Sequence, residues 1–232
     1  MKDSGRAAWN EDQKKMRTLL THSEHVQEGI ELFLQQHGIL HDVSITPEFP
    51  YHFQNEVLDD FPQVYWRIIL PNGEHSIVWL FWHLTRIEDA TLSMLVAGED
   101  PLFEKDGWQE KLGISFTDTG NSMTTAEIQQ LSDEMNIDAL MEYRKAVARH
   151  TRKIVQLLTG EALCQKVDAD QIVRMLEIGV VRISDQGLLD YWGGLTRAGV
   201  LLMPPTRHTL IHINEAQTLK RKVLRFVAKQ KK

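Results

Sequence analysis

Four long stretches of the chain repeat apolar residues at steps of three and four, the period of a helix with one buried face. They cover about residues 7–37, 76–97, 138–160 and 204 onward. Boundary residues support this division. Gly38 and Gly98 follow the first two stretches, Ser76 is a good N-cap, and Pro204-Pro205 suits a first helical turn. The pattern predicts an all-helical fold.

Long connections separate these helices. Residues 42–73 contain four prolines, which exclude a long helix there. Within this segment, residues 64–70 are consistent either with a short strand before a turn or with a loop packed across the helices. About two dozen residues follow Gly98, enough for a crossover between parallel helices. Thr124 and Glu127 then have capping-box spacing, which predicts a further short helix.

Residues 161–203 give a weaker pattern. Two segments in it look helical, 170–177 and 187–200, although Gly193-Gly194 and Gly199 disfavour the second. We expect 42–73 and 161–203 to be irregular or partly helical connections within one domain spanning 1–232, a length that suits a single domain.

Composition restricts the cellular setting. The first twenty residues carry charges throughout and lack the apolar core of a secretory signal, and the longest apolar run is too short to span a bilayer. The single cysteine, Cys164, cannot form an internal disulfide, so we expect a cytoplasmic protein in which this thiol is buried filler. The net charge of −6 argues against nucleic-acid binding, and we interpret the basic segment from Lys220 to Lys232 as a solvated helix end.

Three histidines fall on faces predicted to be buried. His208 and His212 are one helical turn apart, and His83 lies in the apolar stripe between Leu80 and Ile87. Two imidazoles at that spacing can bind one metal ion, and an inward imidazole is costly unless bonded. The residues alone leave two interpretations open: a shared metal ion, or three separately satisfied core histidines. His37 and His41 have the same spacing, but we expect Gly38 to break the helix between them.

Two segments resemble the signature regions of the DinB/YfiT-like superfamily. They are WLFWHLTRIEDATLSMLVAGE (79–99) and MPPTRHTLIHINEA (203–216), and the likeness extends over roughly residues 10–228. In that family a histidine after a tryptophan and a pair of the form RHxxxH complete a three-histidine site. The matching positions are His83 after Trp82, and His208 and His212 after Arg207.

The resemblance implies a four-helix bundle of up-down-down-up topology and a divalent ion, zinc or nickel, held by His83, His208 and His212. It also implies frequent homodimers and a metal-dependent enzyme. The ion would activate a low-molecular-weight thiol or water for transfer to, or hydrolysis of, a small substrate. A non-catalytic metal-binding or stress-response protein with the same fold is the alternative. The sequence names neither substrate nor reaction.

Other polar residues are weaker candidates for catalysis. Glu88 and Asp89 either orient a ligand histidine or move a proton, or they form a solvent-facing acidic pair near Arg86, the interpretation that we favour. His150 lies on the inner stripe of its helix and can line the pocket or add a fourth ligand. The remaining side chains are expected in simpler roles: His22 and His25 at the surface, Arg207, Asn214 and Glu215 on the helix surface or behind the ligands, and Trp82, Tyr143 and Trp192 in the core or walling an apolar pocket.

Overall fold

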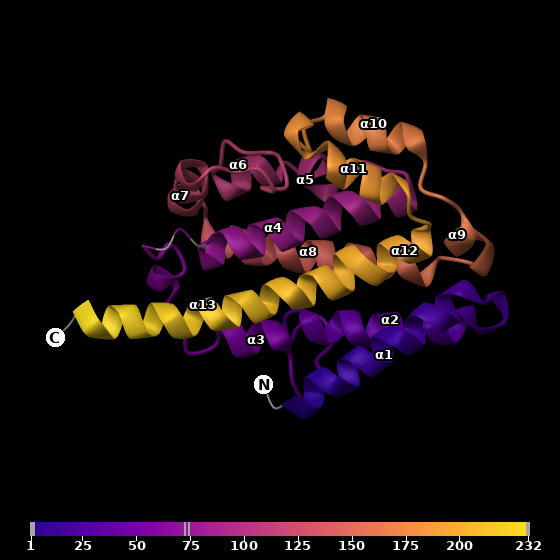
Figure 1. The fold of residues 1–232 in the computed structure, drawn as a ribbon, viewed down its shortest axis with the longest axis horizontal. Coiled ribbons are helices and arrows are strands. Elements are labelled where there is room, and N and C mark those ends of the chain that lie inside the picture. The colour runs from indigo at the N-terminus through magenta and orange to yellow at the C-terminus, as the bar shows by residue number, and fades with distance from the viewer. Residues whose placement is uncertain (1–2, 72, 74, 231–232) are drawn as a thin grey trace.

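A computed structural model describes residues 3–71, 73 and 75–230 of the chain (Figure 1). Helices make up 72% of the structure, and the described residues contain no strand beyond an isolated bridge between Lys166 and Thr196. The predicted all-helical class is therefore confirmed. None of the described helices combines the length and the apolar character needed to cross a membrane.

The N-terminal part is a helical hairpin rather than the single helix expected over 7–37. Helix α1 (Asp3–Thr21) and helix α2 (Val26–Leu40) are joined by a short 3-10 turn, η1 (Ser23–His25), and pack along each other (Figure 1). A Cβ at Gly29 would lie 2.9 Å from Leu20 Cδ2, so glycine permits this close approach. The single-helix prediction was wrong because α1 and α2 each bury an apolar face. The helical period of apolar residues therefore continues through the turn between them and gives no sign that the chain reverses.

Gly38 does not end α2, contrary to expectation. The helix continues to Leu40, and a Cβ at Gly38 would lie 2.7 Å from Thr46 Cγ2. This glycine therefore serves the close packing of the following loop. Because the helix is unbroken, His37 at its end and His41 at its C-cap lie one turn apart.

The proline-containing segment holds only short helices, as expected. Helix α3 spans Phe53–Leu58 and the 3-10 turn η2 spans Gln63–Tyr65. The strand interpretation of 64–70 was wrong, and the chain there packs as a loop. Trp66 is buried and its indole N–H donates to the Phe61 carbonyl at 2.9 Å.

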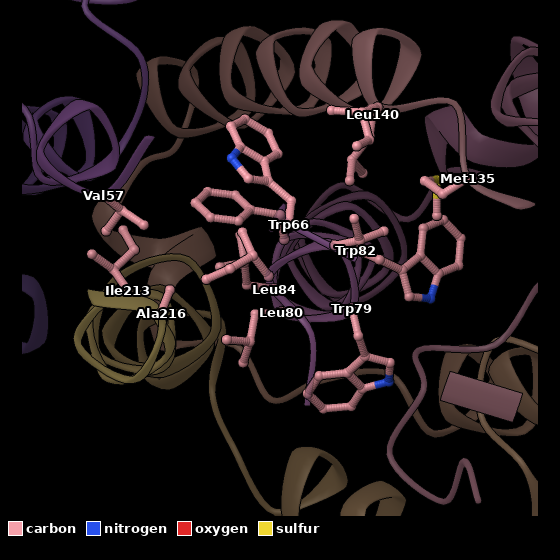
Figure 2. Close-up of a cluster of buried hydrophobic side chains, with 14 of the residues drawn as sticks. Val57, Trp66, Trp79, Leu80, Trp82, Leu84, Met135, Leu140, Ile213 and Ala216 are labelled. Carbon is pink, nitrogen blue, oxygen red and sulfur yellow. The ribbon is translucent and has the colours of Figure 1, made fainter. Parts of the chain in front are cut away.

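Helix α4 (Ile77–Ala90) is the central element of the fold. All of its residues are buried, and a π-helical segment, η3 (Thr91–Ala97), continues it to Gly98 at φ 74°. The Ser76 side chain accepts from Trp79 N, so both predicted ends of this helix are confirmed. In Figure 2 the side chains of α4 leave its axis on every side, with Leu80 and Leu84 directed toward Ile213 and Ala216 of the last helix.

The crossover after Gly98 forms three short helices that cover one side of α4. They are α5 (Leu102–Lys105), α6 (Trp108–Leu112) and α7 (Thr125–Glu134), the last with the capping box predicted at Thr124. Helix α8 (Ile137–Gln156) follows and packs against α4. It ends four residues before the predicted boundary, and Leu157 beyond it is 83% exposed.

The segment 161–203 is largely helical. It contains α9 (Gly160–Cys164), α10 (Ala169–Glu177), the 3-10 turn η4 (Ile183–Asp185), α11 (Gln186–Gly193) and α12 (Arg197–Leu202). The predicted helix over 187–200 is thus interrupted after Gly193. Cys164 is exposed, so the prediction of a buried thiol was wrong, because short helix α9 buries only Leu163.

Pro204 and Pro205 lie in the first turn of a helical segment, as predicted. A π-helical segment, η5 (Met203–His208), links α12 to α13 (Thr209–Gln230). The C-terminal part of α13 extends beyond the neighbouring helices in Figure 1. Near its start, α13 packs against α4, so the HxxxH pair lies beside the centre of the fold.

Candidate metal centre

Three histidines from two parts of the chain converge on one point. His83 comes from α4, His208 is the last residue of η5, and His212 lies in the first turn of α13. Each offers one ring nitrogen, and these atoms all lie within 4.8 Å of one another. His83 Nε2 and His208 Nε2 are 3.2 Å apart. The structure thus brings together the three histidines singled out from the sequence, and we call them the three-histidine cluster.

Hydrogen bonds fix the ring orientations of two of these histidines. His83 Nδ1 donates to the Thr119 carbonyl at 2.7 Å, and His212 Nδ1 donates to Glu215 Oε2 at 2.9 Å. Each ring therefore presents an Nε2 lone pair to the cluster. Metal-binding histidines are typically held in this way, with the second nitrogen bonded to a carbonyl or carboxylate.

Burial favours the neutral form of two of the three rings. It lowers the pKa of His83 to about 3, with the neighbouring His212 adding to the effect. Burial, together with His83 and His212, also holds the pKa of His208 well below its usual value. Neutral imidazole is the form that binds metal ions.

The donor set fits a divalent cation. Two nitrogens at 2.0–2.1 Å from one tetrahedral ion lie roughly 3.3 Å apart, close to the observed His83–His208 separation. The two facing atoms are both ring nitrogens, so only one of them can carry a proton and the pair leaves room for at most one hydrogen bond. An ion at Nε2 would give all three rings a common partner.

A carboxylate and a stacked tryptophan surround the cluster. Glu215 Oε1 accepts from His75 Nδ1 at 3.0 Å while its other oxygen holds His212. Partial burial acts to raise the pKa of Glu215, but hydrogen bonds from His212 and His75 outweigh it and lower that pKa to about 2. The Trp79 ring stacks between His75 and His83, at centroid distances of 3.7 and 4.7 Å.

The cluster is deep on one side and reachable on the other. His83 is 3% exposed, whereas the His212 side chain keeps 16% of its surface accessible. A small molecule can therefore approach from the α13 side, while the α4 side excludes water.

Glu88 is not at the surface, which corrects the interpretation favoured from the sequence. It is fully buried, and its Oε1 accepts from His37 Nε2 and from the Thr151 hydroxyl, both at 2.8 Å. His41 Nε2 lies 3.3 Å from Glu88 Oε2. The structure thus places Glu88 in a separate group of potential metal-binding residues, His37, His41 and Glu88, which we call the buried cluster.

Asp89 is also buried and belongs to neither cluster. It accepts from the Tyr143 hydroxyl at 2.6 Å and from the backbone N–H groups of Leu102 and Phe103 at 2.9 Å, beside Arg86. Its contacts tie the crossover to α4 and α8. The solvent-facing pair predicted for Glu88 and Asp89 was wrong because α4 is buried on all sides.

The remaining candidates have ordinary structural roles. His150 pairs with Glu99 at 2.8 Å and is not among the residues gathered at either cluster. His22 and His25 are exposed, as predicted. Trp82, Tyr143 and Trp192 are packed in the core. Arg207 is exposed, while Glu215 stands behind His212.

Sequence reasoning missed the buried cluster and His75. The His37–His41 spacing was visible, but it was set aside on the expectation that Gly38 ends the helix. His75 carries no periodic signal because it precedes α4, and only the fold places it beside Glu215.

Comparison with known protein families gives one match. Residues 54–178, slightly more than half of the chain, match the family model of the DinB superfamily. The matched region contains α4 with His83, whereas His208 and His212 lie beyond it. No curated protein sequence is significantly similar to this chain.

Proposed function

The chain belongs to the DinB superfamily, and on this premise we propose that its three-histidine cluster binds one divalent metal ion for catalysis on a small molecule. The observation that carries the proposal is the convergence of three imidazoles, two of which are oriented by hydrogen bonds to Thr119 and Glu215. Zinc or nickel is the expected ion, since imidazole ligands suit both.

Three histidines leave a coordination position for a substrate. Structural zinc sites usually have four protein ligands, whereas three plus an exchangeable position is the catalytic arrangement. No fourth histidine, cysteine or carboxylate is grouped with His83, His208 and His212 among the described residues. A bound divalent ion would lower the pKa of a thiol or water molecule at that position and thereby supply a nucleophile.

The residues of the chain orient the ligands and shape the site. Thr119 and Glu215 hold the rings of His83 and His212, and Trp79 covers one face of His83. The His75–Glu215 pair, with both side chains over one third exposed, offers a route by which a proton can leave toward solvent. We propose transfer of a low-molecular-weight thiol to a small electrophile, or hydrolysis of a small substrate.

A surface cavity of about 680 Å³ supports a small-molecule ligand. Arg207, the residue before His208, lines it together with Lys14 and Arg17 of α1. These three cations outnumber Glu11, the only acidic residue in the lining. None of the three histidines lines this cavity, so the choice between an enzyme and a non-catalytic metal-binding or stress-response protein rests on the coordination position.

The finer architecture belongs to the same proposal. We place α2, α4, α8 and α13 in an up-down-down-up four-helix bundle. Two observations support this: α8 contacts α2 and α4, and α13 also contacts α2 and α4. A single domain over 1–232, cytoplasmic location, homodimer formation and no nucleic-acid partner remain predictions from the sequence.

The open coordination position can be tested with Co²⁺. We expect the visible absorption of Co²⁺-loaded protein to change on adding a small thiol or azide, because the added ligand enters the coordination sphere. Absorption spectroscopy during the titration measures this. Spectra that stay constant with every thiol and with azide would mean a closed site and would favour the non-catalytic alternative.

Glu215→Gln is expected to weaken metal binding about tenfold, because loss of a partner behind a ligand typically costs 10–100-fold in affinity. Glutamine keeps the size of the side chain but loses the charge that polarises His212. Competition for Zn²⁺ with a chelating dye measures the change. Glu142→Gln is the matched control, since Glu142 is exposed and pairs with Lys145 at 3.0 Å. Equal affinities of the two variants would remove Glu215 from the site.

A further inference from the structure

We propose that the buried cluster of His37, His41 and Glu88 is a second site for a divalent metal ion. It lies where α2 faces α4 and α8, and it shares no residue with the three-histidine cluster. The inference rests on residues that the proposed function does not use.

The three side chains present their ligand atoms to one another. His37 and His41 lie one turn apart with ring centroids separated by 4.2 Å, and Glu88 faces both from α4. The three candidate ligand atoms lie within 4.8 Å of one another. All three residues are completely buried, so packing fixes their positions.

Two atoms that face each other in this cluster lack hydrogen bonds. His41 Nε2 and Glu88 Oε2 are 3.3 Å apart, yet neither has a hydrogen-bond partner of acceptable geometry. Buried polar atoms in folded proteins are nearly always paired. A cation between the two atoms would satisfy both.

The protonation states suit a metal ion. Burial lowers the pKa of His37 and lowers that of His41 to about 3, so both rings are neutral. Burial acts to raise the pKa of Glu88, but hydrogen bonding with His37 opposes it, and the pKa is held well below the usual value. An ion at His37 Nε2 would require the neutral ring to carry its proton on Nδ1, which is buried and has no hydrogen-bond partner. Two imidazoles and one carboxylate form a common ligand set for zinc and other first-row metals.

Arg144 determines the expected strength of this site. Its buried guanidinium donates to Gln54 Oε1 at 2.6 Å and to the Leu40 carbonyl at 3.3 Å, and its charge acts on His41. A positive charge there opposes a cation, so we expect weaker binding than at the three-histidine cluster. Complete burial requires local opening before an ion can enter, so loading is expected to be slow.

Counting bound ions tests the proposal. The metal-free full-length protein is incubated with Zn²⁺ until its metal content stops rising, freed of excess ion and analysed by native mass spectrometry. We expect two ions in the wild type. Glu88→Gln and His41→Asn should each keep one ion, His212→Ala should also keep one, and Glu88→Gln with His212→Ala should keep none. His52→Asn is the matched control: His52 is buried beside Thr46, outside both clusters, so this variant should keep two.

The outcomes separate the two proposed sites. A wild type that saturates at one ion, lost in His212→Ala and kept in Glu88→Gln, overturns the second site and leaves the three-histidine site intact. One ion that is kept in His212→Ala and lost in Glu88→Gln overturns the proposed function alone. No bound ion overturns both. Circular dichroism identifies folded variants, and if the substitutions in the buried cluster prevent folding, the wild-type count decides.

Discussion

Replacing His212 with alanine is expected to lower the affinity of the tightest metal site at least about a hundredfold, beyond the usual loss for a partner behind a ligand. Alanine removes one of three ligands, and the two imidazoles left, His83 and His208, hold an ion less well. Competition for Zn²⁺ with a chelating dye measures the loss.

The fold of this variant should persist. The His212 side chain is partly exposed, and the core is built from aliphatic and aromatic side chains elsewhere. Circular dichroism should therefore show unchanged helix content. His25→Ala is the matched control, since His25 is exposed and pairs with Glu28. Unchanged zinc affinity in His212→Ala, or wholesale loss of helix, would contradict the expectation.

The sequence predicted most helices because their ends carry chemical signals as well as a period. Ser76, Gly98 and Thr124 fill the cap positions that their types suggest. The hairpin between α1 and α2 was missed because the reversal near His22 has no proline or glycine. The spacing of apolar residues identifies the buried face of a helix. It does not show whether the chain reverses direction between two helices whose apolar faces are both buried.

The candidate metal residues were predictable because each belongs to a recognisable stripe or motif. His83 continues the period of α4, and His208 and His212 share one face of the last helix. Glu88 and Asp89 were misjudged because polarity was used as a guide to exposure. That guide fails on a helix surrounded by others, where carboxylates are retained by partners such as His37 and Tyr143. Those partners are distant in sequence, so only the fold reveals them.

Both clusters contain buried histidines with lowered pKa values, which gives the metal-free protein a characteristic pH dependence. The pKa values of His41 and His83, lowered by burial to about 3, compare with 6.5 for an unperturbed histidine. Below pH 6.5 the unfolded chain binds protons that the folded chain does not, so stability falls with pH until the folded pKa is reached. Burial raises the pKa of Glu104, so the folded chain binds a proton there more readily than the unfolded chain. This residue therefore adds stability as the pH falls and offsets part of the loss.

We therefore expect the free energy of unfolding of the metal-free protein to fall by at least about 4 kcal/mol between pH 7 and pH 5: about 2 kcal/mol each from His41 and His83, with a further loss from His37 and His208, whose pKa values burial also lowers. That loss is large beside the 5–15 kcal/mol typical of a whole domain. Urea denaturation in the presence of a chelator measures it. His41→Asn should lose about 2 kcal/mol of this pH dependence, because asparagine does not titrate, and the control is His25→Asn, at an exposed position outside both clusters. Equal stability at the two pH values would show that these rings take up protons in the folded chain, and neutral buried ligands would then no longer explain either cluster.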